Sequence, residues 1–113
     1  MRKNKLAPEN IFSANHVDPE KAEKEVFDVL VSSTAVSIER IISKGHRSPA
    51  SGWYDQEKNE WVLLLRGRAE LTFQDQTTVR LEEGDFIHLP PHKKHRVSWT
   101  DPDKETFWLA VHY

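Results

Sequence analysis

The stretch GDFIHLPPHKKHRV, from Gly84 to Val97, decides the fold prediction for this chain. Its first two residues suit a tight turn, because glycine tolerates positive φ and aspartate bonds to its own backbone. The next four residues have the composition of a short strand, and two prolines end it because proline supplies no N–H to a sheet. By the period of two, His95, Val97 and Trp99 then share one side of a second strand. His95 is therefore expected to point into the space that the first strand faces.

The same strand-and-turn pattern recurs along most of the chain. Strands are predicted at Phe27 to Val31, Val36 to Ser43, Glu60 to Leu65, Ala69 to Phe73, Thr77 to Leu81, Phe86 to Leu89, from His95 onward, and Thr106 to Tyr113. Residues with turn chemistry separate them, as in Arg66-Gly67-Arg68. This spacing of short strands predicts an all-β fold, an antiparallel sandwich or barrel.

An N-terminal arm is predicted over residues 1–25, ahead of a barrel domain over residues 26–113. The first sixteen residues are polar apart from Ile11 and Phe12, so they form either a frayed end or an arm laid on a partner subunit. Asp18 and Pro19 suit the N-cap and the first position of a helix. The helical segment would be short, because hardly any apolar face follows it.

Composition excludes several classes of function. A chain of 113 residues with net charge −2 is one domain with no overall field to recruit nucleic acid or an anionic membrane. The absence of cysteine excludes disulfides and thiolate sites, and the longest apolar run, Trp61 to Leu65, cannot span a bilayer. No glycine-rich phosphate loop or serine-nucleophile elbow is present, so no nucleotide cofactor is expected. We expect a soluble cytoplasmic protein.

Two pieces of this pattern resemble the cupin family of small β-barrels. The second cupin motif places a glycine, a proline and a histidine at the spacing of Gly84, Pro90 and His95. The first motif ends in a glutamate and a glycine at the spacing of Glu60 and Gly67. The resemblance covers roughly residues 36 to 113. It implies a jelly-roll barrel with a pocket at one mouth, which in many relatives holds a divalent metal on three histidines and the glutamate.

The two histidines of the first motif are missing from this chain. Their positions fall on Trp53 and Asp55, or with the shorter spacing on Tyr54 and Gln56. The resemblance therefore leaves Glu60 and His95 as two metal ligands, with Asp55 as a third and His46 as a fourth that could swing in from its loop. Such an oxygen-rich set favours Fe²⁺, Mn²⁺ or Zn²⁺. In the alternative, the barrel has lost its metal and keeps Glu60 and His95 as a hydrogen-bonded pair lining a pocket.

The orientation of Glu60 decides whether it is a functional residue. Glu60 shares a strand face with Val62 and Leu64, and if that face points inward, burial raises the pKa of the carboxyl unless a cation or donor compensates. In the alternative, Trp61, Leu63 and Leu65 point inward and Glu60 lies outside. We prefer the first orientation, with Glu60 as catalytic base.

Aromatic and basic residues near these positions are candidates for ligand binding. Trp53 and Tyr54 precede the candidate ligand Asp55 and could form a pocket wall. Arg96 belongs to a short basic run that could attract an anionic ligand such as a carboxylate. His88 and His112 are interpreted as structural or surface residues, because a lone strand histidine usually is.

Two functions follow from these residues. The first is a metal-assisted oxygenase or isomerase acting on a small organic ligand, with Glu60 alternatively serving as general base without a metal. The second is a metal-free, non-catalytic module that binds or senses a small molecule. In either case we expect a homodimer, because edge strands require covering and the strand from Phe27 to Val31 could pair with a partner.

Overall fold

The computed structural model describes residues 6–13, 25–49 and 52–113. All regular secondary structure in these ranges is β-strand, so the described chain has the all-β architecture predicted from the sequence. The helical turn predicted at Asp18 lies outside the described residues. Nothing in the described ranges is a helix long and apolar enough to cross a membrane.

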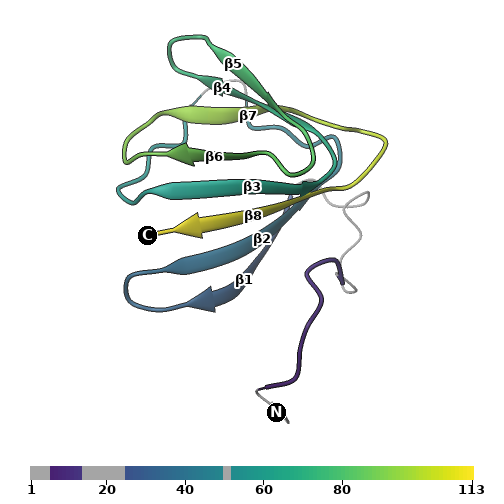
Figure 1. The fold of residues 1–113 in the computed structure, drawn as a ribbon. Coiled ribbons are helices and arrows are strands. Elements are labelled where there is room, and N and C mark those ends of the chain that lie inside the picture. The colour runs from purple at the N-terminus through teal and green to yellow at the C-terminus, as the bar shows by residue number, and fades with distance from the viewer. Residues whose placement is uncertain (1–5, 14–24, 50–51) are drawn as a thin grey trace.

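Eight strands follow one another along the described chain (Figure 1). They are β1 (Val26–Ser32), β2 (Ser37–Ser43), β3 (Glu60–Arg66), β4 (Ala69–Phe73), β5 (Thr78–Leu81), β6 (Phe86–Leu89), β7 (His95–Thr100) and β8 (Thr106–His112). Each strand coincides within a few residues with one predicted from alternation. The patterning of apolar and polar residues therefore suffices to place the strands.

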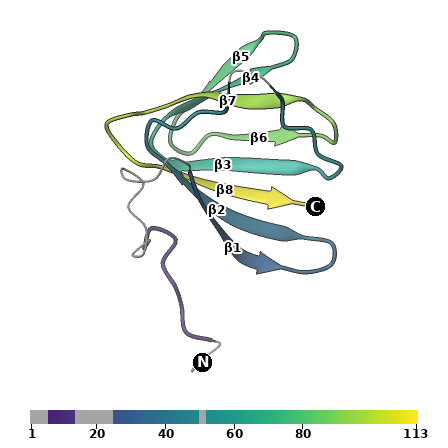
Figure 2. The same ribbon diagram turned by 180° about the vertical axis from the view of Figure 1, so that it is seen from behind.

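The strands form two antiparallel sheets that enclose a core. One sheet has the order β1-β2-β8-β3-β6 and the other β5-β4-β7. The two views in Figures 1 and 2 show β1 and β5 at opposite ends of the molecule. The smaller sheet thus faces only part of the larger one, and β1 forms an edge where Phe27, Val29 and Val31 remain about half exposed.

The core confirms the preferred orientation of β3. Val62 and Leu64 are 5% and 0% exposed and pack with Leu71 and Trp108, whereas Trp61 lies on the outer face against Phe86. Since side chains alternate along a strand, Glu60 is carried inward with Val62 and Leu64. It is itself buried at the start of β3.

A β-bulge corrects one part of the sequence prediction. Leu71 of β4 pairs with Val97 and Glu70 pairs with Trp99, so the register shifts by one residue in β7. A bulge of this kind moves the following side chain to the other face of the sheet. The prediction that Trp99 shares a face with His95 is therefore wrong, and the Trp99 ring lies 5.1 Å from the Arg80 guanidinium instead.

Residues 11–13 of the described N-terminal segment lie against the outer face of this chain's own larger sheet, whereas residues 6–10 are exposed. Nη1 of Arg40 donates hydrogen bonds to the carbonyls of Ile11 and Ser13 at 3.1 and 3.0 Å, and Nη2 pairs with Asp28 at 2.7 Å. The Phe12 ring makes an edge contact with Phe107 at 5.3 Å. One buried arginine thus fixes both the segment and strand β1 to β2.

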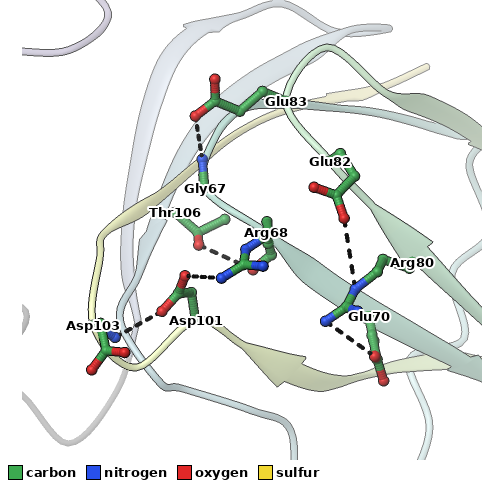
Figure 3. Close-up of polar contacts among 9 residues, drawn as sticks. All are labelled: Gly67, Arg68, Glu70, Arg80, Glu82, Glu83, Asp101, Asp103 and Thr106. Atoms are coloured by element: carbon green, nitrogen blue, oxygen red, sulfur yellow. Dashed lines mark hydrogen bonds and ion pairs between the residues drawn. The ribbon is translucent and has the colours of Figure 1, made fainter.

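The turn from β3 to β4 is held by polar contacts from three directions (Figure 3). Gly67 donates its N–H to Glu83, Arg68 pairs with Asp101 at 3.1 Å, and Thr106 donates its hydroxyl to the Arg68 carbonyl. Gly67 has a φ of +98°, and a Cβ there would lie 2.7 Å from the Cα of Thr106. Glycine is required at this position for both conformation and space.

We predict that Gly67→Ala lowers the free energy of unfolding by about 3 kcal/mol or more, because backbone strain and a clash with Thr106 add. Gly84→Ala is the matched control: Gly84 has a φ of +89°, but a methyl group added there would have no atom within 4 Å. It should cost only about 1 kcal/mol. Urea denaturation measures both values, and equal losses would contradict the proposed close approach at Gly67.

Candidate functional site

A buried carboxylate lies between two imidazoles at the open end of the barrel. The two oxygens of Glu60 lie 3.5 Å from Nε2 of His95 and 3.3 Å from Nε2 of His112. The side-chain amide of Gln56 also donates a hydrogen bond to Glu60 at 2.7 Å. All three neighbours can donate a hydrogen bond, so the arrangement stabilises a negative charge on Glu60.

Three strands from distant parts of the sequence bring these groups together. Glu60 begins β3 and is paired with His112 near the end of β8, so their side chains are neighbours on one sheet face. His95 begins β7 in the opposite sheet and forms an isolated bridge with Tyr54. Nδ1 of His95 lies 2.9 Å from the carbonyl of Lys93. If Nδ1 carries a proton, that contact directs Nε2 toward Glu60.

Burial and hydrogen bonding act in opposite directions on these groups. Burial raises the pKa of Glu60, but its interactions with His95, His112 and Gln56 outweigh burial, so the pKa lies below its ordinary value of 4.5. Burial lowers the pKa of His95, but Glu60 and the Lys93 carbonyl outweigh it, and the pKa is raised above 6.5. The pair is therefore stabilised as an ionised carboxylate and an imidazolium.

These groups line a cavity of about 240 Å³. Its floor and walls are largely apolar, formed by Val62, Leu71, Leu89, Val97, Ile41 and Trp108. Phe27 and Tyr54 stand at the more exposed part of the lining. An apolar cavity with a few convergent polar groups is the usual form of a small-molecule site.

Of the three predicted ligand-binding residues, Trp53, Tyr54 and Arg96, one lines the cavity. Tyr54 lines the cavity, and its ring centroid lies 5.6 Å from that of His95. Neither Trp53 nor Arg96 is among the lining residues. The Arg96 guanidinium instead lies 4.7 Å from the centre of the Trp53 ring.

The structure also separates the four predicted metal ligands. Glu60 and His95 lie together, but Asp55 contacts Nδ1 of His92 at 2.7 Å, with both side chains exposed. His46 accepts a hydrogen bond from the Lys44 N–H and is not part of the cavity lining.

The described side chains do not fit a metal centre in this arrangement. In the described ranges, no three His, Asp or Glu side chains are grouped so that they could hold an ion. Both oxygens of Glu60 are directed at imidazoles rather than at a shared point.

His112 belongs to the site, although its sequence context suggested a structural or surface role. Strict alternation in β8 places Trp108, Ala110 and His112 on one face, and Trp108 and Ala110 are 3% and 0% exposed. Alternation along β8 from the buried Trp108 therefore predicts that His112 also faces the interior. Gln56, in the loop before β3, was marked by the resemblance to the cupin motif: with the shorter spacing, Tyr54 and Gln56 take the two missing histidine positions, and both line the cavity.

Known proteins with the same pattern identify the family. Residues 40–112 match the cupin domain family model. The chain belongs to the cupin family. No curated protein matches the sequence.

Several solved cupin structures resemble this one. A protein from Ralstonia eutropha JMP134, proposed to be a mannose-6-phosphate isomerase, is 38% identical, with a TM-score of 0.84 over 94% of this chain and 96% of that one. An RmlC-like cupin from Desulfovibrio desulfuricans has a TM-score of 0.71 at 15% identity, covering 95% and 96% of the two chains. An RmlC-like cupin with a double-stranded β-helix fold from Methanocaldococcus jannaschii has a TM-score of 0.65 at 19% identity, covering 91% and 92%. The last two show the jelly-roll fold alone.

The ion pair at this site predicts a pH dependence of stability. The lowered pKa of Glu60 contributes stability that is lost as pH falls through the folded value, below 4.5. The raised pKa of His95 contributes stability that is complete below 6.5 and lost as pH rises through the folded value. Wild type should therefore exceed Glu60→Gln in stability most between these two pH values, and less at pH 8 to 9.

Thermal unfolding of the two proteins across this range measures the difference. NMR titration should place the His95 pKa above 6.5 in wild type and lower in Glu60→Gln. A stability difference that grows steadily from pH 6 to pH 9 would contradict the ion pair.

Proposed function

We propose that this cupin binds a small organic ligand in the mouth of its barrel and catalyses an isomerisation by proton transfer. The observation that carries the proposal is the carboxylate of Glu60 between two imidazoles in a largely apolar cavity. A base and proton donors that line one largely apolar cavity are what acid–base catalysis needs.

The chemistry assigns a separate role to each group. Glu60 removes a proton from the carbon next to a carbonyl, and the C–H electron pair forms the double bond of an enol. The protonated imidazole of His95 donates its proton to the carbonyl oxygen as that bond forms. Glu60 then returns the proton to the former carbonyl carbon, while the hydroxyl on the neighbouring carbon gives its proton to the neutral imidazole and becomes the new carbonyl. Both protein groups recover their starting protonation states, so there is no net change in protons or electrons. The ion pair between Glu60 and His95 supplies both partners in the required protonation states.

The similarity to the Ralstonia protein supports a reaction of this class. That protein is proposed to be an isomerase of a sugar phosphate, and it is similar over almost the whole of both chains. An aldose–ketose isomerisation moves a proton between neighbouring carbons, which is the step assigned to Glu60.

We also propose that the protein is cytoplasmic, in keeping with its lack of cysteine.

A second function is favoured by the contacts of Glu60. Its carboxylate already receives a hydrogen bond from Gln56 and faces two imidazoles, so it is well satisfied without substrate. A non-catalytic module that binds a small molecule in the same cavity would use this cluster only to position the ligand. A metal-assisted reaction would require Glu60, His95 and a third side chain to turn toward one point.

Deuterium exchange tests the isomerase proposal without assuming a particular substrate. Unphosphorylated and phosphorylated aldoses are incubated with the protein in D₂O, and NMR follows deuterium at the carbon next to the carbonyl. Wild type should catalyse incorporation into at least one aldose, and Glu60→Gln should lower the rate about 10²- to 10⁴-fold because the base is lost.

Glu57→Gln is the matched control, since Glu57 is exposed and does not line the cavity. It should retain the wild-type rate. Absence of exchange with every aldose, combined with saturable binding of one of them, would favour the non-catalytic module. Loss of exchange after chelation, restored by Fe²⁺, Mn²⁺ or Zn²⁺, would favour the metal-assisted reaction.

We also propose a homodimer. The larger sheet ends at β1, whose exposed Phe27, Val29 and Val31 form an apolar edge beside the cavity. Pairing with the β1 edge of a second copy would remove this surface from water. Light scattering at micromolar concentration should give twice the chain mass of 13.2 kDa, and Val29→Lys should shift the mass toward the monomer. A monomer mass for wild type would exclude the dimer.

A further inference from the structure

Three carboxylates and two imidazoles line the cavity, and both imidazoles face the same carboxylate, that of Glu60. Glu25, Glu39 and Glu60 contribute to the lining, together with the imidazoles of His95 and His112. No lysine or arginine lines it within the described ranges. A carboxylate or phosphate on a ligand requires a cation or several donors to replace its water. Because both imidazoles already face Glu60, this lining is poorly suited to an anion.

Two of the three carboxylates are not neutralised by a positive charge within the part of the chain that the structure describes. Glu25 accepts a hydrogen bond from the Ser43 hydroxyl at 2.7 Å, and Ser43 in turn accepts one from the Trp108 indole at 3.2 Å. Glu39 is half-buried, and its side chain makes no hydrogen bond or ion pair with another described residue. Only Glu60 faces imidazoles. A ligand that donates a hydrogen bond to Glu39 would supply the missing partner.

The nearby basic side chains are held by partners outside the cavity. Within the run from His92 to Arg96, the His92 imidazole contacts Asp55, and the Lys93 ammonium lies 5.1 Å from the centre of the Phe73 ring. Arg96 lies over Trp53. The sequence suggested that this run could attract an anion, but Lys93, Lys94 and Arg96 do not line the cavity.

We infer that this cavity selects small ligands that carry hydrogen-bond donors and no phosphate or carboxylate group, that is, uncharged hydroxy-carbonyl compounds or amines. This inference rests on the proposed function and specifies its substrate class. The size agrees with it: about 240 Å³ lies below the roughly 300–1,000 Å³ typical of drug-sized ligands. The carboxylates set a negative potential at the mouth, and Glu39 receives a donor from the ligand.

Paramagnetic nitroxides of nearly equal shape measure that potential directly. The cationic aminomethyl-PROXYL, the uncharged carbamoyl-PROXYL and the anionic carboxy-PROXYL are each added to isotope-labelled protein at neutral pH and low salt. NMR records the relaxation that each causes at the Ile41 and Val97 methyl groups, which line the cavity, and at Leu63 on the outer face. We expect the cationic probe to relax the cavity methyls roughly fivefold more than the anionic one, because a negative potential of slightly less than about one kT concentrates the cation and depletes the anion to this extent.

Single substitutions assign the effect to the mouth carboxylates. Glu39→Gln should reduce the ratio of cationic to anionic relaxation by about half or more. Glu105→Gln removes an equal charge from an exposed residue that does not line this cavity, and should leave the ratio unchanged. An equal or larger effect of carboxy-PROXYL at Ile41 in wild type would overturn the inference, as would a ratio unaffected by Glu39→Gln.

The aldose exchange experiment supplies the second readout. Among aldoses that exchange, the unphosphorylated compound should have the higher kcat/KM, and an amino sugar should separate the amine class from the uncharged class. Faster exchange with the phosphorylated aldose would overturn the inference while leaving the acid–base role of Glu60 intact. A negative potential without any exchange would leave the charge selection standing and remove the isomerase. The two proposals therefore fail separately.

Discussion

The interaction on which the site depends is the contact of the buried Glu60 carboxylate with the imidazoles of His95 and His112. A carboxylate buried without donors would be uncharged or strongly destabilising. Here the register of β3 against β8 places His112 beside it, and the opposite sheet supplies His95. The site therefore exists only when both sheets are correctly assembled, which couples its chemistry to the fold.

The rest of the fold holds these strands in place. The turn between β3 and β4 is fixed by Gly67, which leaves room for Thr106 at the start of β8. At the other edge, Arg40 ties strand β1 and the N-terminal segment to β2. Because β1 and β2 extend beyond the smaller sheet, Phe27 and Glu39 face the open side of the cavity.

Most of the fold could be predicted from alternation, which depends on local residues alone. The spacing from Glu60 to Gly67, and from Gly84 through Pro90 to His95, indicated the cupin family, and the family match confirms it. The inward orientation of Glu60 was also predictable, although the apolar Trp61, Leu63 and Leu65 allowed the opposite one.

The remaining errors and omissions have specific physical causes. Trp99 faces outward because a bulge changes the alternation in β7, and no local residue announces that bulge. Asp55 contacts His92 across two loops, and such a pairing depends on loop conformation rather than on period. His112 was recoverable from the alternation of β8, but a single histidine carries little weight until its neighbour across the sheet is known. Charge selection by the cavity required knowing which carboxylates converge.

A crystal structure of protein purified without chelator would show directly whether Glu60 lies between the imidazoles of His95 and His112. We predict that the oxygens of Glu60 lie within about 3.5 Å of Nε2 of both histidines, inside an open cavity that Glu39 also lines. The result that would contradict it is a Glu60 side chain turned out of the barrel. Imidazoles and carboxylate converging at about 2.1 Å on one ion would contradict it equally.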